Sequence, residues 1–82
     1  MSPIKDVDNL IEVAIVAQKV RKKLIEGDPM AAVDEAKVHS PFMEINLSES
    51  DVKGLGSIRA DKFSTFVEVC IKTGLASGKE SL

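Results

Sequence analysis

Apolar residues dominate the first third of the chain and recur with the period of a helix. Between residues 10 and 20 nearly every position is apolar, and the polar positions nearby fall on one narrow strip of a helical wheel. The strip consists of Lys5, Asp8, Glu12, Lys19, Lys23 and Glu26. Asp6 is a suitable N-cap and Gly27 a suitable C-terminal stop, so the pattern predicts one long helix over residues 7–26.

A short helix and an extended connection are predicted next. Asp28 and Pro29 are typical of an N-cap and a first helical residue, and Pro41 prevents the helix from continuing, which places it over residues 30–38. Residues 41–47 are expected to form an extended connection on the core, or alternatively a strand that pairs across a dimer. The side chains expected to reach the core from this connection are Phe42, Ile45 and Leu47.

A third helix is predicted to begin after Ser48. Ser48 and Asp51 have the spacing of a capping box, in which each side chain accepts a hydrogen bond from the backbone of the other residue. The helix is expected over residues 49–53, because Gly54-Leu55-Gly56 interrupts the pattern.

The last helix has the clearest amphipathic pattern of the chain. Its apolar residues recur at i, i+3, i+4, i+7 and i+8, which is the spacing of one buried helical face. These residues are Phe63, Phe66, Val67, Cys70 and Ile71. The helix is expected to begin at Ile58 or Ala60 and to end at Thr73, because Gly74 suits a left-handed C-terminal residue.

The elements together predict a small all-α domain of four helices, one long and three shorter. With 82 residues, of which 44% are apolar and 29% charged, the chain has the composition of one folded domain over residues 1–82. Residues 1–5 and 76–82 are expected to fray. The expected core consists of Leu10, Ile11, Ala14, Ala17, Met30, Val33, Phe42, Leu55, Phe63, Phe66, Val67 and Cys70.

The predicted long helix is apolar on two flanks, and both flanks must be covered. Either the three short helices cover both, or one flank contacts another protein, most simply a second copy of the chain. The second arrangement predicts a non-catalytic interaction protein that self-associates or belongs to a larger assembly. The candidate interface residues are Val13, Ile15, Val16, Val20 and Leu24.

Residue types that carry chemistry are few. One histidine, His39, and one cysteine, Cys70, do not provide the spacing of a zinc or haem site. The acidic residues do not follow the calcium-loop pattern, and no phosphate-loop or dinucleotide signature is present. We therefore expect no enzyme, no metal and no cofactor.

The sequence also predicts a cytoplasmic protein without a membrane span. Its longest uninterrupted apolar run covers residues 13–17, whereas a span needs about 20 residues. The first six residues lack the cationic start and apolar stretch of a signal peptide. A single cysteine cannot form an intramolecular disulfide, as is usual in a reducing compartment.

One segment resembles a known nucleic-acid-binding motif. Residues 54–63 read Gly-Leu-Gly-Ser-Ile-Arg-Ala-Asp-Lys-Phe, and the region 52–63 resembles the hairpin of the helix-hairpin-helix family. The matching positions are Gly54, Leu55, Gly56, Ala60 and Phe63. The resemblance implies a tight turn whose backbone amides hold a DNA phosphate without reading the sequence. The residues implied are Lys53, Gly54, Gly56, Arg59 and Lys62; alternatively, the two glycines only form a tight turn between helices.

The uneven distribution of charge bears on both hypotheses. Residues 27–51 carry one lysine against six acidic residues, whereas the segments before and after them are slightly basic. The acidic residues near the glycines oppose a phosphate site. Segments of opposite charge suit a protein partner, or self-association, at least as well.

Overall fold

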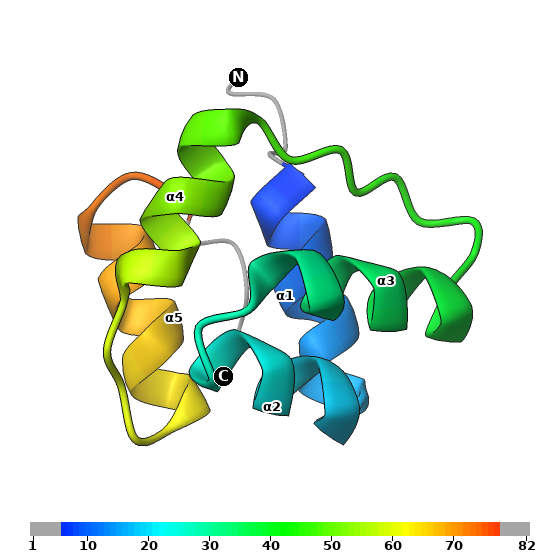
Figure 1. The fold of residues 1–82 in the computed structure, drawn as a ribbon, viewed down its shortest axis with the longest axis horizontal. Helices are drawn as coiled ribbons and strands as arrows, with labels where there is room; N and C mark the ends of the chain where they lie inside the picture. Colours follow the sequence, from blue (N-terminus) through cyan, green and yellow to red (C-terminus); the bar gives the residue numbers. More distant parts are fainter. Residues whose placement is uncertain (1–5, 78–82) are drawn as a thin grey trace.

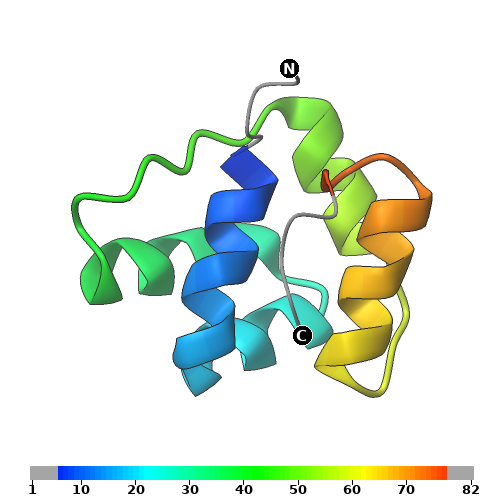
Figure 2. The same ribbon diagram turned by 180° about the vertical axis from the view of Figure 1, so that it is seen from behind.

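The computed structural model describes residues 6–77, and within this range the protein contains helices and no strand. The helices are α1 (Asp6–Val16), α2 (Gln18–Ile25), α3 (Pro29–His39), α4 (Glu49–Ser57) and α5 (Phe63–Lys72). In Figures 1 and 2, α4 and α5 occupy one side of the molecule, the end of α3 lies at the opposite side, and α1 runs between them. The all-α class is confirmed, but one long helix with three shorter ones is wrong, because the five helices have similar lengths of 8–11 residues.

The predicted long helix is broken at Ala17. This residue has an extended backbone, with φ −123° and ψ 104°, although alanine is the strongest helix former. The Nη1 atom of Arg21 donates hydrogen bonds to the carbonyl oxygens of Ala14 and Ile15, both at 2.8 Å. The carbonyl of Ala14 also accepts a hydrogen bond from the N–H of Ala17 at 3.3 Å, so Arg21 adds to the hydrogen bonds that satisfy the end of α1.

The break decides how the apolar surface of the first third of the chain is covered. Val13, Val20 and Leu24 are spaced i, i+7 and i+11, so a straight helix would place them on one flank. In the structure all three are buried in the same core as Leu10 and Ile11. The change of direction at Ala17 therefore allows the chain to cover Val13, Val20 and Leu24 by itself, whereas Ile15 and Val16 stay exposed.

The start of α3 follows the prediction closely. Gly27, at φ 85°, ends the preceding turn, and Pro29 is the first residue of the helix. The Oδ1 atom of Asp28 accepts a hydrogen bond from the backbone N–H of Ala31 at 3.2 Å, as an N-cap does.

The connection between α3 and α4 follows the prediction only in part. It is extended, and Ile45 is buried while Leu47 is half-buried, as expected. Phe42, however, is fully exposed, so its placement in the core was wrong. The connection is held to α1 only beyond this residue, where the carbonyl of Glu44 accepts a hydrogen bond from the side chain of Asn9 at 2.8 Å. Figure 1 shows this segment running outside the helices along one edge of the molecule.

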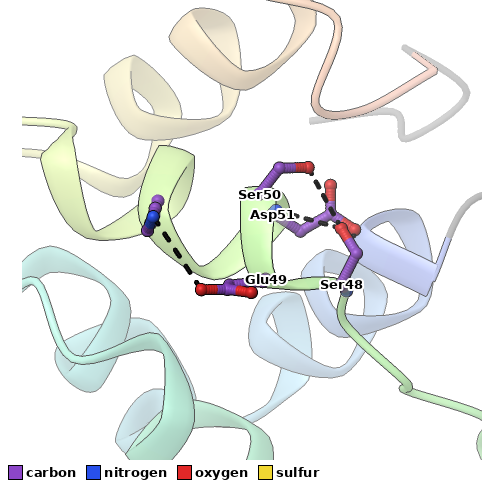
Figure 3. A network of polar contacts seen from close by, with 5 residues as sticks. Ser48, Glu49, Ser50 and Asp51 are labelled. Carbon is purple, nitrogen blue, oxygen red and sulfur yellow. Dashed lines mark hydrogen bonds and ion pairs between the residues drawn. The ribbon is translucent and has the colours of Figure 1, made fainter.

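Helix α4 begins with the predicted capping box, which Figure 3 shows in close-up. The Oγ atom of Ser48 accepts a hydrogen bond from the N–H of Asp51 at 3.1 Å, and the carboxylate of Asp51 accepts one from the N–H of Ser48 at 3.3 Å. The predicted interruption at Gly54-Leu55-Gly56 is wrong, because α4 continues through these residues to Ser57.

The two glycines of α4 allow close packing rather than a turn. A Cβ atom at Gly54 would lie 2.9 Å from Cδ2 of Leu75, closer than a real contact allows. A Cβ atom at Gly56 would lie 3.7 Å from the carbonyl oxygen of Gly27 and from Cδ of Pro29, which is ordinary contact. Gly54 therefore brings α4 against the C-terminal segment, and Gly56 lies against the turn before α3.

Helix α5 begins at Phe63, later than predicted, and Gly74, at φ 81°, lies just beyond its end as expected. The fraying predicted from residue 76 is wrong for Ala76 and Ser77. Ala76 is buried and its N–H donates to the carbonyl of Cys70, and the N–H of Ser77 donates to Oδ1 of Asp8 at 2.9 Å. Asp8, a member of the polar strip of the first helix, is only 3% exposed. The predictions for residues 1–5 and 78–82 lie outside the described residues.

The observed core contains most of the predicted residues. Those confirmed as buried are Leu10, Ile11, Ala14, Val33, Leu55, Phe66, Val67 and Cys70. Ala17 and Phe63 pack against the core while half-buried, and Met30 is wrong because about half of it is exposed. Helix α3 instead buries the small residues Ala32 and Ala36, which allow its backbone to approach its neighbours closely.

Candidate protein-interaction surface

Two large apolar side chains are exposed at the C-terminal end of α3, and a third is exposed at the end of α1. Phe42 is 100% exposed, Val38 is 81% exposed and Val16 is 70% exposed. Val38 lies in the last turn of α3, Phe42 follows Pro41 in the connection, and Val16 ends α1. We call these residues, together with the two hollows described next, the α3-end surface.

Two hollows of the molecular surface meet at this end of α3. The first, of about 480 Å³, lies between the start of α2 and the last turns of α3, and the second, of about 500 Å³, lies along residues 39–43. The first is lined by Ala17, Gln18, Lys19, Val20, Glu35, Val38 and His39. The second is lined by His39, Ser40, Pro41, Phe42 and Met43. His39 lines both hollows.

Local features of the sequence produce this surface. The break at Ala17 brings the first turn of α2 to one wall of the first hollow, opposite α3. Pro41 lacks a backbone N–H and follows the last residues of α3, and the N–H of Met43 closes a turn onto the carbonyl of Ser40 at 3.1 Å. Phe42 lies inside that turn and is directed away from the core.

The first hollow carries one charge of each sign. Lys19 lines it from α2 and Glu35 lines it from α3. Among residues 6–77 the ion pairs join Lys23 with Glu26, Lys53 with Glu49, and Lys72 with Glu68. Neither Lys19 nor Glu35 belongs to these pairs, so both charges remain open to a partner.

Of the five interface residues predicted from sequence, three are buried and two are exposed in the structure. Val13, Val20 and Leu24 belong to the core and cannot contact a partner, whereas Ile15 and Val16 are exposed. Sequence reasoning missed Val38 and Phe42. An apolar residue in the last turn of a helix and a phenylalanine after a proline carry no local signal that separates exposure from burial.

The residues predicted to contact a nucleic-acid backbone do not form the implied cradle. Gly54 and Gly56 lie within α4, so the tight turn is wrong and their amides are not collected at one point. Lys53 forms an exposed ion pair with Glu49 at 3.8 Å. Arg59 donates to the carbonyl of Gly56 at 3.1 Å, and Lys62 is the N-cap residue of α5.

Cys70 is fully buried in the core. No group of three or more His, Cys, Asp or Glu side chains within residues 6–77 is placed to hold a metal ion. Every helix in this range is too short or too polar to cross a membrane.

Comparison with known proteins adds no relative. No protein-family model matches the chain, and neither a curated protein nor a solved structure shows significant similarity to it.

Proposed function

We propose that this protein is a non-catalytic interaction module that contacts another protein through the α3-end surface, either by self-association or as a small subunit of a larger assembly. The observation that carries the proposal is the complete exposure of Phe42, with Val38 and Val16 also largely exposed. Phe42 is one of only three aromatic residues in the chain.

The free energy of burying these side chains supports the proposal. Full burial of a phenylalanine or valine side chain stabilises an association by roughly 1.5–3 kcal/mol relative to leaving it in water. Aromatic residues that fill a hollow in a partner contribute most of the binding energy of many interfaces. The surface around them is mixed, with His39, Lys19 and Glu35 beside the apolar groups, as in interfaces with a polar rim.

We also propose that the protein is cytoplasmic. Its support is the cysteine content, a single residue in 82, Cys70, whose side chain is buried. A chain of this size outside a reducing compartment commonly depends on disulfides for its stability.

Site-specific photo-crosslinking tests the proposed contact. A photoreactive phenylalanine analogue replaces Phe42 in one variant and Ser64, an exposed residue of α5, in the matched control. We expect discrete protein adducts from position 42 in the cells that produce the protein, and none from position 64. Adducts that are absent at position 42, or equal at both positions, would contradict the proposal.

A further inference from the structure

We propose that Ala17 is a hinge at which α1 and α2 can join into one continuous helix, and that two copies of the chain then exchange α1 and form a dimer. The observation that carries the proposal is a helix break that no local feature of the sequence explains. The inference goes beyond the proposed function, because it requires neither Val38 nor Phe42.

The break at Ala17 lacks the usual local causes. Sharp breaks in helices occur mostly at proline or glycine, and residues 7–26 contain neither. Figure 1 shows α2 running across the end of α1 instead of continuing its axis. Only Ala17 is extended between them, since its N–H still donates to the carbonyl of Val13 at 2.9 Å and its own carbonyl accepts from the N–H of Arg21 at 3.2 Å. A change in the backbone of one residue therefore joins the two helices.

The continuous helix forms hydrogen bonds that the broken one lacks. At the start of α2, the N–H groups of Gln18 and Lys19 have no acceptor within that helix. In a continuous helix they donate to the carbonyls of Ala14 and Ile15, which in the monomer accept from Arg21 at 2.8 Å. Arg21 therefore favours the broken form, because the continuous helix satisfies the same carbonyls without it.

A continuous helix withdraws α1 from its own core, and the site that fits α1 is the same site in a second copy. The apolar face of α1 is buried in the core. Its polar side chains bond to groups later in the chain: Asn9 donates to the carbonyl of Glu44 at 2.8 Å, and Asp8 accepts from the N–H of Ser77 at 2.9 Å. A second copy carries the same core and the same partners, so the exchange restores these contacts between copies.

The two continuous helices must cross at Ala17. In the monomer this residue alone separates the end of α1 from the start of α2. After the exchange these two ends belong to different copies, and the small side chain of alanine allows their helices to approach closely. Ile15 and Val16, which are 36% and 70% exposed in the monomer, lie within one turn of the crossing, where the second helix covers apolar surface.

Gln18→Pro tests the hinge. Gln18 is the first residue of α2, where proline is favourable, and a proline there restricts Ala17 to an extended backbone like the one it has. The same proline breaks a continuous helix, so Gln18→Pro should weaken dimerisation by roughly a hundredfold or more. Gln18→Ala is the matched control, because alanine suits both forms, and it should dimerise like the wild type.

Arg21→Ala should act in the opposite direction. It removes two hydrogen bonds from the broken form alone, so the exchanged dimer should form roughly tenfold more tightly than in the wild type. Lys22→Ala, at an exposed position of the same helix, is the matched control and should leave dimerisation unchanged.

Sedimentation velocity measures dimerisation at twice the monomer mass of 8.8 kDa. Each variant is first refolded from urea over a range of concentrations, because exchange of a buried helix requires the core to open. Circular dichroism confirms that each variant is folded. In a mixed dimer of isotope-labelled and unlabelled chains, NMR should show the side chain of Asn9 in one copy in contact with the backbone of Glu44 in the other.

Three results would overturn the proposal. The first is a protein that stays monomeric after refolding, both as the wild type and as Arg21→Ala. The second is a dimer that Gln18→Pro leaves unchanged, and the third is a dimer in which Asn9 contacts Glu44 of its own copy. Phe42→Ser should leave the exchanged dimer intact, and crosslinking at position 42 does not require the hinge, so failure of this inference and failure of the proposed function are distinguishable.

Discussion

At the scale of single residues, two residues of the same type have different roles according to what packs against them. Gly54 and Gly56 are two residues apart in α4, and both are helical. A Cβ atom at Gly54 would overlap the end of the Leu75 side chain, whereas one at Gly56 would meet its neighbours at 3.7 Å. A side chain at Gly54 therefore requires Leu75 to move, whereas one at Gly56 does not.

This difference predicts opposite effects of alanine at the two positions. Gly56→Ala should raise the free energy of unfolding by about 0.5–1 kcal/mol, because glycine inside a helix is less favourable than alanine by that amount. Gly54→Ala gains the same propensity but must displace Leu75, and overpacking costs about 1–3 kcal/mol, so its stability should be at or below that of the wild type. Urea denaturation of both variants measures the difference, and equal gains would contradict the packing of Leu75 on Gly54.

At the scale of secondary structure, the break between α1 and α2 has the largest consequence. Alanine favours the helix at position 17, yet the backbone there is extended. Burial of Val20 and Leu24 in the common core favours the break. Arg21 lowers its cost, since its guanidinium donates to two carbonyls at the end of α1. A side chain four residues beyond the break thus supplies hydrogen bonds to the end of α1.

Removal of that side chain should destabilise the protein. Arg21→Ala leaves the carbonyls of Ala14 and Ile15 without this donor, and hydrogen bonds to a charged group at a half-buried site predict a loss of about 1–2 kcal/mol. The matched control is Lys22→Ala, an exposed neighbour on the same helix that should change stability by less than about 0.5 kcal/mol. Thermal unfolding followed by circular dichroism measures both. Similar small effects of the two variants would show that Arg21 does not support the break.

At the scale of the whole molecule, the first helix and the C-terminal segment hold each other in place. The carboxylate of Asp8, which is only 3% exposed, accepts a hydrogen bond from the N–H of Ser77, 69 residues later in the chain. Next to this bond in sequence, Ala76 is buried and Leu75 lies against Gly54. The C-terminal segment is therefore a structural part of the domain, and it joins α1, α4 and α5.

Replacement of the buried carboxylate should release this segment. Asp8→Ala removes the acceptor of the Ser77 N–H, which predicts a loss of about 1–3 kcal/mol and faster amide hydrogen exchange at Ala76 and Ser77. Glu12→Ala, at an exposed position of the same helix, is the control and should leave exchange at these amides unchanged. Exchange measured by NMR tests this directly. Unchanged protection of Ser77 in Asp8→Ala would contradict its role in anchoring the segment.

Local signals in the sequence were sufficient to predict several boundaries of the fold. Asp28 and Pro29 begin α3, Ser48 and Asp51 begin α4, and Gly74 lies just beyond the end of α5, all as the sequence predicts. These features depend on hydrogen bonds and backbone angles within about four residues, so the neighbouring residues alone determine them. The face that α5 buries through Phe66, Val67 and Cys70 follows from helical periodicity in the same way.

Only the tertiary structure decided which apolar surfaces are covered. The break at Ala17, the helical state of Gly54 and Gly56, and the anchoring of Ser77 all depend on segments distant in sequence. The exposure of Phe42 depends on where the connection is held to α1, which no local pattern encodes. The sequence by itself therefore determined that the chain forms amphipathic helices with defined ends. Their mutual packing determined that Val13, Val20 and Leu24 are covered internally, and that Val38 and Phe42 are exposed at the end of α3.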